Sequence, residues 1–235
     1  MRILLTGGSG FTGRSLLPML ENSGFEVCHL VRKKKGYKEE FLWNFADDLP
    51  NGLPECAVVI HLAAYVNFGQ TLEWAQYNVN TVSSLKLAAY AQSHDAYFIL
   101  ASTVSVHGLN STIIDEKTPL NPDNNYVLSK YLAEQVVKTF TKKYSILRIA
   151  GIYGLDGPEH LGLNKTISDA FYRKMKPTLV GPGKAKRNYI CVHDVARWIL
   201  HLVQSFEERR ELKKNSLKET LYFAGPEIMS IENYL

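Results

Sequence analysis

The feature that most constrains this chain is the run of residues 2–13, in which a short apolar segment breaks into glycines and then resumes. Such a run predicts a strand, a tight turn and a helix. Glycines at positions 7, 10 and 13 fit three needs of a dinucleotide turn: the turn itself, close approach of the pyrophosphate, and packing of the helix on the strand. The first N–H groups of the helix would then face phosphate oxygens, with the positive end of the helix dipole behind them.

The same three glycines also fit a tight corner that binds no ligand, so the interpretation needs support from the rest of the chain. If the turn does hold a dinucleotide, its contacts are expected from residues along the whole turn. These residues are Gly7, Ser9, Gly10, Phe11, Thr12 and Gly13.

Composition limits the classes of protein to which the chain belongs. Its 235 residues, 46% of them hydrophobic, suffice for one large or two small domains. The net charge of +4 is mild and no basic stripe with interleaved aromatics is present, which argues against a nucleic-acid partner. Three scattered cysteines predict neither a disulfide framework nor a metal site. No apolar run reaches membrane-spanning length and no leader is recognisable, so we expect a cytoplasmic protein without membrane contact.

Strands and helices alternate over the first 150 residues. A broad apolar face at helical spacing predicts a helix over 70–93, and a further helix begins at Asn125. This alternation predicts the α/β class, with a doubly wound parallel sheet of the Rossmann type. After the first strand, the expected strands cover residues 25–31, 40–45, 56–62, 96–102 and 145–149.

Beyond residue 150 the alternation fails, which predicts a second and smaller part of the molecule. Within it, residues 165–175 are expected to form a helix and 177–180 a strand. The division that we expect is 1–150 with 186–204 and 219–225 for the NAD(P)-binding domain, and 151–185 with 205–235 for a small C-terminal substrate lobe.

The end of the second strand indicates which cofactor the turn would hold. Arg32 and Lys33 stand where an NAD site usually places an acid on the adenosine ribose, which favours NADP over NAD. A solvated basic loop without a ligand is the alternative. Further cofactor contacts are expected from the ends of the next two strands, at Asn44, Phe45, Leu62, Ala63 and Ala64.

A tyrosine and a lysine in the later helix form a candidate acid/base pair. Tyr126 and Lys130 are four residues apart and share a helical face. An ammonium beside a phenol favours the phenolate, which predicts a pKa for Tyr126 below its usual value of about 10. Tyr172 and Lys176 have the same spacing, but only the first pair follows a strand end rich in hydroxyls, where Ser102, Thr103 and Ser105 are expected to face the substrate.

Taken together, these motifs resemble the extended short-chain dehydrogenase/reductase family, of the NAD-dependent epimerase/dehydratase kind that acts on nucleotide sugars. The segments that carry the resemblance are 6–13, 60–64, 78–81, 102–108, 126–130, 152–154 and 187–196. The resemblance implies that Tyr126 is the acid/base, that Lys130 lowers its pKa and holds the nicotinamide ribose, and that Thr103 bonds the reacting oxygen.

The same resemblance implies roles for two residues outside that group. Asn80 would shape the neighbouring helix, and Arg187 would meet the pyrophosphate of a nucleotide sugar, or else pair with Asp194 as a structural arginine. The family also implies a homodimer through the helices that carry Asn80 and Tyr126.

Departures from the family pattern narrow the reaction. Val104 and Ser105 follow Thr103 where sugar-nucleotide dehydratases carry acids, and Ser105 stands where a 3,5-epimerase-reductase has cysteine. Both activities are therefore disfavoured. His107 replaces the usual tyrosine and is expected to be structural. The chain ends at Leu235, where the family normally continues, so either the sequence is cut short or this is a reduced member.

Three functions remain open. The simplest is a carbon-4 epimerase acting on a nucleotide sugar, which needs only Thr103, Tyr126 and Lys130. The rival is an NADPH-dependent carbonyl or hydroxysteroid-like reductase, favoured by the basic strand end and by residues 66–68. The third is a cofactor-sensing protein that keeps the fold without turnover.

Overall fold

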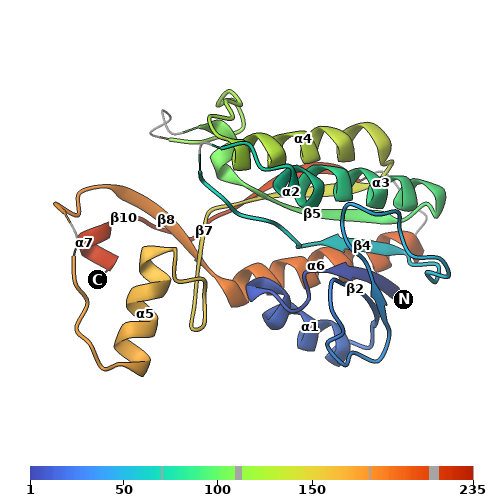
Figure 1. Ribbon diagram of the computed structural model, residues 1–235, viewed down its shortest axis with the longest axis horizontal. Helices are drawn as coiled ribbons and strands as arrows, with labels where there is room; N and C mark the ends of the chain where they lie inside the picture. The colour runs from blue at the N-terminus through green and yellow to red at the C-terminus, as the bar shows by residue number, and fades with distance from the viewer. Residues whose placement is uncertain (70, 109–112, 180, 212–216, 235) are drawn as a thin grey trace.

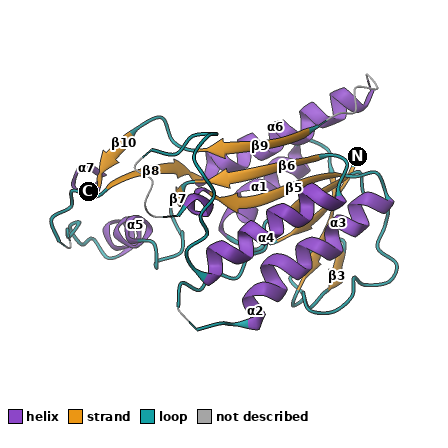
Figure 2. Cartoon of the chain, turned by 90° about the horizontal axis from the view of Figure 1, so that it is seen from above, coloured by secondary structure: helices purple, strands orange, loops and turns teal. Residues whose placement is uncertain are grey.

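A seven-stranded parallel sheet with helices on both faces forms the larger part of the computed structural model (Figures 1 and 2). The structure describes residues 1–69, 71–108, 113–179, 181–211 and 217–234. The strand order is β3-β2-β1-β4-β5-β6-β9, and every neighbouring pair is parallel. The strands are β1 (Arg2–Thr6), β2 (Glu26–Val31), β3 (Glu40–Leu42), β4 (Val58–His61), β5 (Tyr97–Thr103), β6 (Tyr144–Ile149) and β9 (Lys218–Phe223).

One face of the sheet packs on α1 (Phe11–Asn22) and α6 (Val192–Glu211), the other on α3 (Ser83–Ser93) and α4 (Asn125–Phe140). Figure 1 shows the two pairs of helices on opposite sides of the strands. The strands that lie between them are apolar on both faces, as a sheet covered on both sides requires. The predicted fold class, a doubly wound Rossmann-type sheet, is confirmed.

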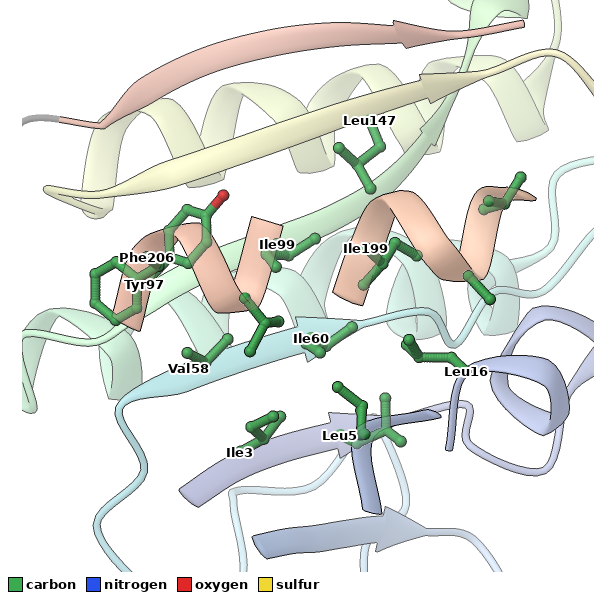
Figure 3. Close-up of a cluster of buried hydrophobic side chains, with 14 of the residues drawn as sticks. Ile3, Leu5, Leu16, Val58, Ile60, Tyr97, Ile99, Leu147, Ile199 and Phe206 are labelled. Carbon is green, nitrogen blue, oxygen red and sulfur yellow. The ribbon is translucent and has the colours of Figure 1, made fainter. Parts of the chain in front are cut away.

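The core on the α1 and α6 side is a continuous apolar cluster (Figure 3). Ile3 and Leu5 of β1 meet Leu16 of α1, while Ile199 and Phe206 of α6 cover β4 and β5. Burial of each such side chain contributes about 1.5–3 kcal/mol. This packing holds the glycine turn between β1 and α1 in a fixed place at the carboxyl edge of the sheet.

A π-helical turn interrupts the helix expected over 70–93. The chain forms α2 (Trp74–Tyr77), the π turn η1 (Asn78–Val82) and then α3, while residue 70 lies outside the described residues. Such single π turns are frequent at functional sites. The buried Asn80 lies in this turn, so the expectation that Asn80 shapes its helix agrees with the local geometry.

The smaller part is built on a three-stranded sheet of order β10-β8-β7. Its elements are β7 (Gly151–Tyr153), α5 (Gly162–Tyr172), β8 (Lys186–Cys191), β10 (Ile228–Ser230) and α7 (Ile231–Tyr234). We call these elements and their connections the lobe. Figure 2 shows it beyond the carboxyl ends of the large sheet, at the opposite end of the molecule from the N-terminus.

Several element boundaries differ from those predicted. The described residues of 177–183 form no strand, because two prolines and glycines with positive φ at 181 and 183 break an extended ladder, and Val180 lies outside the described residues. The strand expected over 40–45 ends at Leu42. The boundary expected at residue 205 falls inside α6, whose Phe206 packs in the sheet core. The two-part division, with 205–211 assigned to the sheet side, stays a proposal.

Candidate active site

A cleft of about 1,020 Å³ lies at the carboxyl ends of the strands, between the glycine turn, α4 and the lobe. It is the place where open α/β sheets bind ligands. Most of the side chains expected from the sequence line it: Gly7, Ser9, Gly10, Phe11, Thr12, Gly13, Arg32, Lys33, Phe45, Leu62, Ala63, Ala64, Ser102, Thr103, Ser105, Tyr126 and Lys130. Asn44, Asn80 and Arg187 are not among the lining residues.

The glycine turn forms a cradle that side chains would fill. Gly7 has φ +73°, and a Cβ there would lie 2.6 Å from the nitrogen of Ala63. A Cβ on Gly13 would overlap the carbonyl oxygen of Gly7. Gly10 is the N-cap of α1 and offers no side-chain cap, so the first N–H groups of that helix remain available to an anion. The turn therefore fits a dinucleotide pyrophosphate.

A buried hydrogen-bond relay that sequence reasoning missed supports the turn from below. Thr6 Oγ1 lies 2.6 Å from His61 Nδ1 and accepts the N–H of Ala63. The hydroxyl of Ser83 donates to the carbonyl of Val79, so its oxygen accepts from His61 Nε2 at 2.9 Å. His61 thus carries its proton on Nε2, and burial lowers its pKa to about 3. The relay joins β1, β4 and the π turn.

The adenosine end of the cleft is basic. Arg32, Lys33 and Lys35 line it beyond the end of β2, together with the ring of Phe45. Asn44 is exposed, and its carbonyl oxygen accepts the N–H of Asp47. Of the described residues that line the cleft, one is acidic: Asp156, which belongs to the lobe. This end of the cleft is therefore suited to an anionic group.

The reactive end holds a nearly buried ammonium. Lys130 is 2% exposed and lines the cleft, and its Nζ makes no hydrogen bond or ion pair within the described part of the chain. Burial lowers its pKa to about 8, against the opposing charge of Glu134. Buried charges normally have partners, so this ammonium is suited to hydrogen-bond a ligand in the cleft.

The acid/base candidate Tyr126 lies one helical turn before Lys130 on α4, but its pKa is not the one predicted from the sequence. Burial raises its pKa to about 12, so the predicted lowering by Lys130 is wrong for the protein alone. Loss of hydration outweighs the favourable spacing on the helix. The ring of Phe68 meets the ring of Tyr126 edge-on, with centroids 5.3 Å apart.

Asn80 acts from behind the cleft. Its amide oxygen accepts the N–H of Tyr65, and its amide nitrogen donates to the carbonyl of Tyr65 and to Ser129 Oγ, each at 2.8–2.9 Å. Ser129 Oγ in turn donates to the carbonyl of Tyr126. Asn80 therefore fixes α4, and with it Lys130, against the segment that follows β4.

The hydroxyls at the end of β5 have different roles. Ser102 donates to the buried carboxylate of Glu134 at 2.6 Å, so its hydroxyl is not directed at a substrate as expected. Thr103 and Ser105 lie 3.1 Å apart at their side-chain oxygens and both line the cleft. His107 is buried and bonded to Tyr222 and to the carbonyl of Pro119, which agrees with the structural role expected for it.

Two sequence candidates lie away from the reacting end. Arg187 is exposed and donates to the carbonyl of Lys186, and Asp194 pairs with Arg197 instead. Arg187 therefore does not pair with Asp194, and its contact with a substrate pyrophosphate stays a prediction. Tyr172 is exposed on α5, and its hydroxyl donates to Asp156 at 2.6 Å. The choice of the Tyr126 pair over the Tyr172 pair agrees with this placement.

Several lining residues were missed because no sequence signal marks them. Val66, Phe68 and Val104 add apolar side chains to the lining, and Phe68 contacts the ring of Tyr126. Arg14 donates to the carbonyl of Asp156. His160 lines the lobe side. Within this group, the sequence pointed to the segment 66–68 as a feature favouring a reductase and to Val104 as a departure from the dehydratase pattern.

The described residues hold neither a cluster of three metal-ligating side chains nor a helix long and apolar enough to cross a membrane. The chain matches the model of the "NAD dependent epimerase/dehydratase family" over residues 3–214. A putative UDP-glucose 4-epimerase of Methanocaldococcus jannaschii is 29% identical over 218 residues, which are 83% of this chain and 71% of that protein.

Two solved structures have the same fold. The UDP-N-acetylglucosamine 4-epimerase of Bacillus cereus superposes with a TM-score of 0.82 at 24% identity, over 100% of this chain and 81% of that one. The UDP-glucuronic acid 4-epimerase of Bacillus cereus, in complex with NAD, gives 0.80 at 23% identity, over 99% and 81%.

Proposed function

The chain belongs to the NAD dependent epimerase/dehydratase family, and on that premise we propose that it transfers hydride between a nicotinamide cofactor and a nucleotide sugar, most simply as a carbon-4 epimerase. The observation that carries the proposal is the Lys130 ammonium, which is 2% exposed, lines the cleft and has no partner in the described part of the chain. Such a group needs a ligand that accepts hydrogen bonds, as ribose hydroxyls do.

Each side chain at the reactive end has a separate role in this proposal. Tyr126 exchanges a proton with the sugar oxygen, and Thr103 gives that oxygen a second hydroxyl contact. Lys130 holds the ribose and places positive charge beside the phenol. When bound, the nicotinamide ring supplies or accepts the hydride. The absence of acids at Val104 and Ser105 continues to disfavour loss of water.

The basic end of the cleft bears on the choice between NADP and NAD. We propose NADP in preference to NAD, because Arg32, Lys33 and Lys35 line the cleft beyond the end of β2, where a dinucleotide site usually meets the adenosine ribose. The test is chemical unfolding with NADPH and NADH in separate series. A ligand at about one hundred times its Kd adds about 2.7 kcal/mol to the free energy of unfolding. Stabilisation by NADH alone contradicts this choice.

A second candidate function is supported by the state of Tyr126 and by the aromatic ring beside it. A phenol whose pKa is about 12 is protonated at neutral pH, which suits donation to a carbonyl oxygen during reduction. The ring of Phe68 contacts that of Tyr126, and Val66 and Val104 also line the cleft. An NADPH-dependent carbonyl reductase therefore remains the alternative.

One assay distinguishes the epimerase from the carbonyl reductase. The full chain is incubated with UDP- and GDP-sugars in the presence of NADP⁺, and in a separate series with a panel of ketones and NADPH, while NADPH is followed at its absorbance band. An epimerase forms the second sugar while NADPH stays constant, whereas a reductase consumes NADPH. Tyr126→Phe is expected to remove most of either rate, with Tyr172→Phe as the matched control because Tyr172 has the same spacing to a lysine outside the cleft.

Two results of this assay would contradict the proposed function. Full rate in Tyr126→Phe rules out the proposed acid/base. Stabilisation by cofactor with no turnover across the whole panel favours a cofactor-sensing protein, the third of the open functions.

Self-association through α3 and α4 is the remaining proposal from the family. Leu85 of α3 and Phe140 of α4 are 39% and 41% exposed, which leaves apolar side chains on these helices for a partner copy. Analytical ultracentrifugation of the wild type and of Leu85→Glu tests this, with a dimer expected only for the wild type.

A further inference from the structure

A buried ionic network lies directly behind the reactive end of the cleft. Glu134 of α4 is fully buried and receives the guanidinium of Arg148 through two hydrogen bonds, at 3.1 and 2.8 Å. Ser102, at the end of β5, donates to the same carboxylate at 2.6 Å. The pair thus ties α4 to β5 and β6. Lys138 stands 3.8 Å from the carboxylate on its solvent side.

The network holds the chain both before and after Thr103, at the end of β5. Ser102 precedes Thr103 and is held by Glu134. His107 follows it by four residues, and its Nδ1 donates to the carbonyl of Pro119 at 3.1 Å. Its Nε2 is therefore an acceptor, and it lies 3.2 Å from Arg148. Every contact is buried or partly buried, so one network holds the residues on both sides of Thr103.

Glu134 also lies one helical turn beyond Lys130, itself one turn beyond Tyr126, all on one face of α4. The charge of Glu134 opposes the fall in the pKa of Lys130 that burial causes. The other titratable group that acts on Lys130 from a neighbouring element is His61 of β4, which is held neutral by burial. Arg148 and Lys138 face the carboxylate itself.

Resting on the proposed function, we infer that Glu134 is a positioning residue for the hydride-transfer reaction. Through Ser102 it holds Thr103 in register with Tyr126, and as the buried carboxylate nearest along α4 it keeps the Lys130 ammonium charged. Arg148 orients this carboxylate through two hydrogen bonds. The sheet end and the helix are thereby locked at the distance that the reacting groups require, since a misplacement of about 1 Å can lower a rate by about 100-fold.

The test compares Glu134→Gln, Ser102→Ala and Ser102→Thr with the wild type, using kcat, KM for the nucleotide sugar and thermal unfolding. Glu134→Gln should lower kcat by about 10- to 100-fold with little change in KM. Ser102→Ala should lower kcat in the same direction, and Ser102→Thr should restore most of it because the hydroxyl returns. Glu219→Gln is the matched control, since Glu219 accepts a serine hydroxyl from Ser145 at the far end of the same sheet.

A second measurement does not depend on turnover. Acetic anhydride labels neutral amines, and peptide mass spectrometry gives the labelling rate of Lys130 as a function of pH. In Glu134→Gln the midpoint should fall, and a fall of about one pKa unit from about 8 raises the rate at pH 7 about fivefold. Glu219→Gln should label as the wild type does.

The outcomes separate this inference from the proposed function. A wild type without turnover refutes the proposed function, while the labelling curves still decide whether Glu134 keeps Lys130 charged. Wild-type kcat in Ser102→Ala, or an unchanged Lys130 midpoint in Glu134→Gln, overturns the inference. A change in melting temperature alone, with kcat per folded molecule unchanged, shows a purely structural role and also overturns it. If Glu134→Gln does not fold, the two Ser102 variants decide.

Discussion

The buried His61 predicts a specific loss of stability in acid. Its pKa is about 3 in the fold and about 6.5 in an unfolded chain, so the unfolded state binds the extra proton between these values. The stabilisation from neutral His61 is therefore complete above pH 6.5 and lost as the pH falls toward 3. At pH 4.5 the gap to the unfolded pKa is about 2 units, which amounts to about 3 kcal/mol.

The assay is urea unfolding at pH 7 and pH 4.5 for the wild type and for His61→Gln. Glutamine cannot gain the proton, so the variant, although weaker at pH 7 through the lost relay, should lose about 3 kcal/mol less than the wild type on acidification. His201→Gln, an exposed imidazole on α6, controls for removal of a histidine at the surface. Equal losses in the wild type and His61→Gln would refute the reasoning, because the relay would then not hold the ring neutral.

Three further variants test the site. Lys130→Met removes a buried cation whose pKa falls from 10.5 to about 8, so at pH 7 it should gain about 3 kcal/mol in urea unfolding while losing turnover, and this advantage should fade between pH 8 and 10.5. Gly13→Ala should lose about 1–3 kcal/mol, because its Cβ meets the backbone of Gly8 at 2.6 Å, and should abolish stabilisation by NADPH. Arg32→Ala should weaken NADPH about tenfold in fluorescence titration and leave NADH unchanged, since only NADPH carries the 2′-phosphate.

The sheet and the cofactor turn were predictable because their signals are local. Apolar runs such as 58–61 and the glycines at 7, 10 and 13 report burial and backbone conformation within a few residues. The same holds for the face shared by Tyr126 and Lys130, which depends only on helical spacing. The family resemblance drew on these local segments and is confirmed by the match over residues 3–214.

The features that the sequence did not predict depend on contacts between residues that are far apart along the chain. The pKa of Tyr126 follows from how deeply α4 is buried, and helical spacing says nothing about depth. The relay through His61 joins Thr6 to Ser83, and the pair of Glu134 and Arg148 recruits Tyr222. The pairing of Arg187 with Asp194 also failed, because Asp194 pairs with Arg197 on the next turn of α6.

The two walls of the cleft differ in origin. Thr103, Tyr126 and Lys130 come from β5 and α4, inside the packed body of the sheet, whereas Asp156, His160 and their neighbours reach the cleft from the lobe. A library confined to residues 155–161 would therefore vary what the pocket admits while leaving the proton-transfer apparatus untouched. On the proposed function, recognition and chemistry would come from separate stretches of the chain, and the lobe would be the place to redirect this protein toward a new substrate.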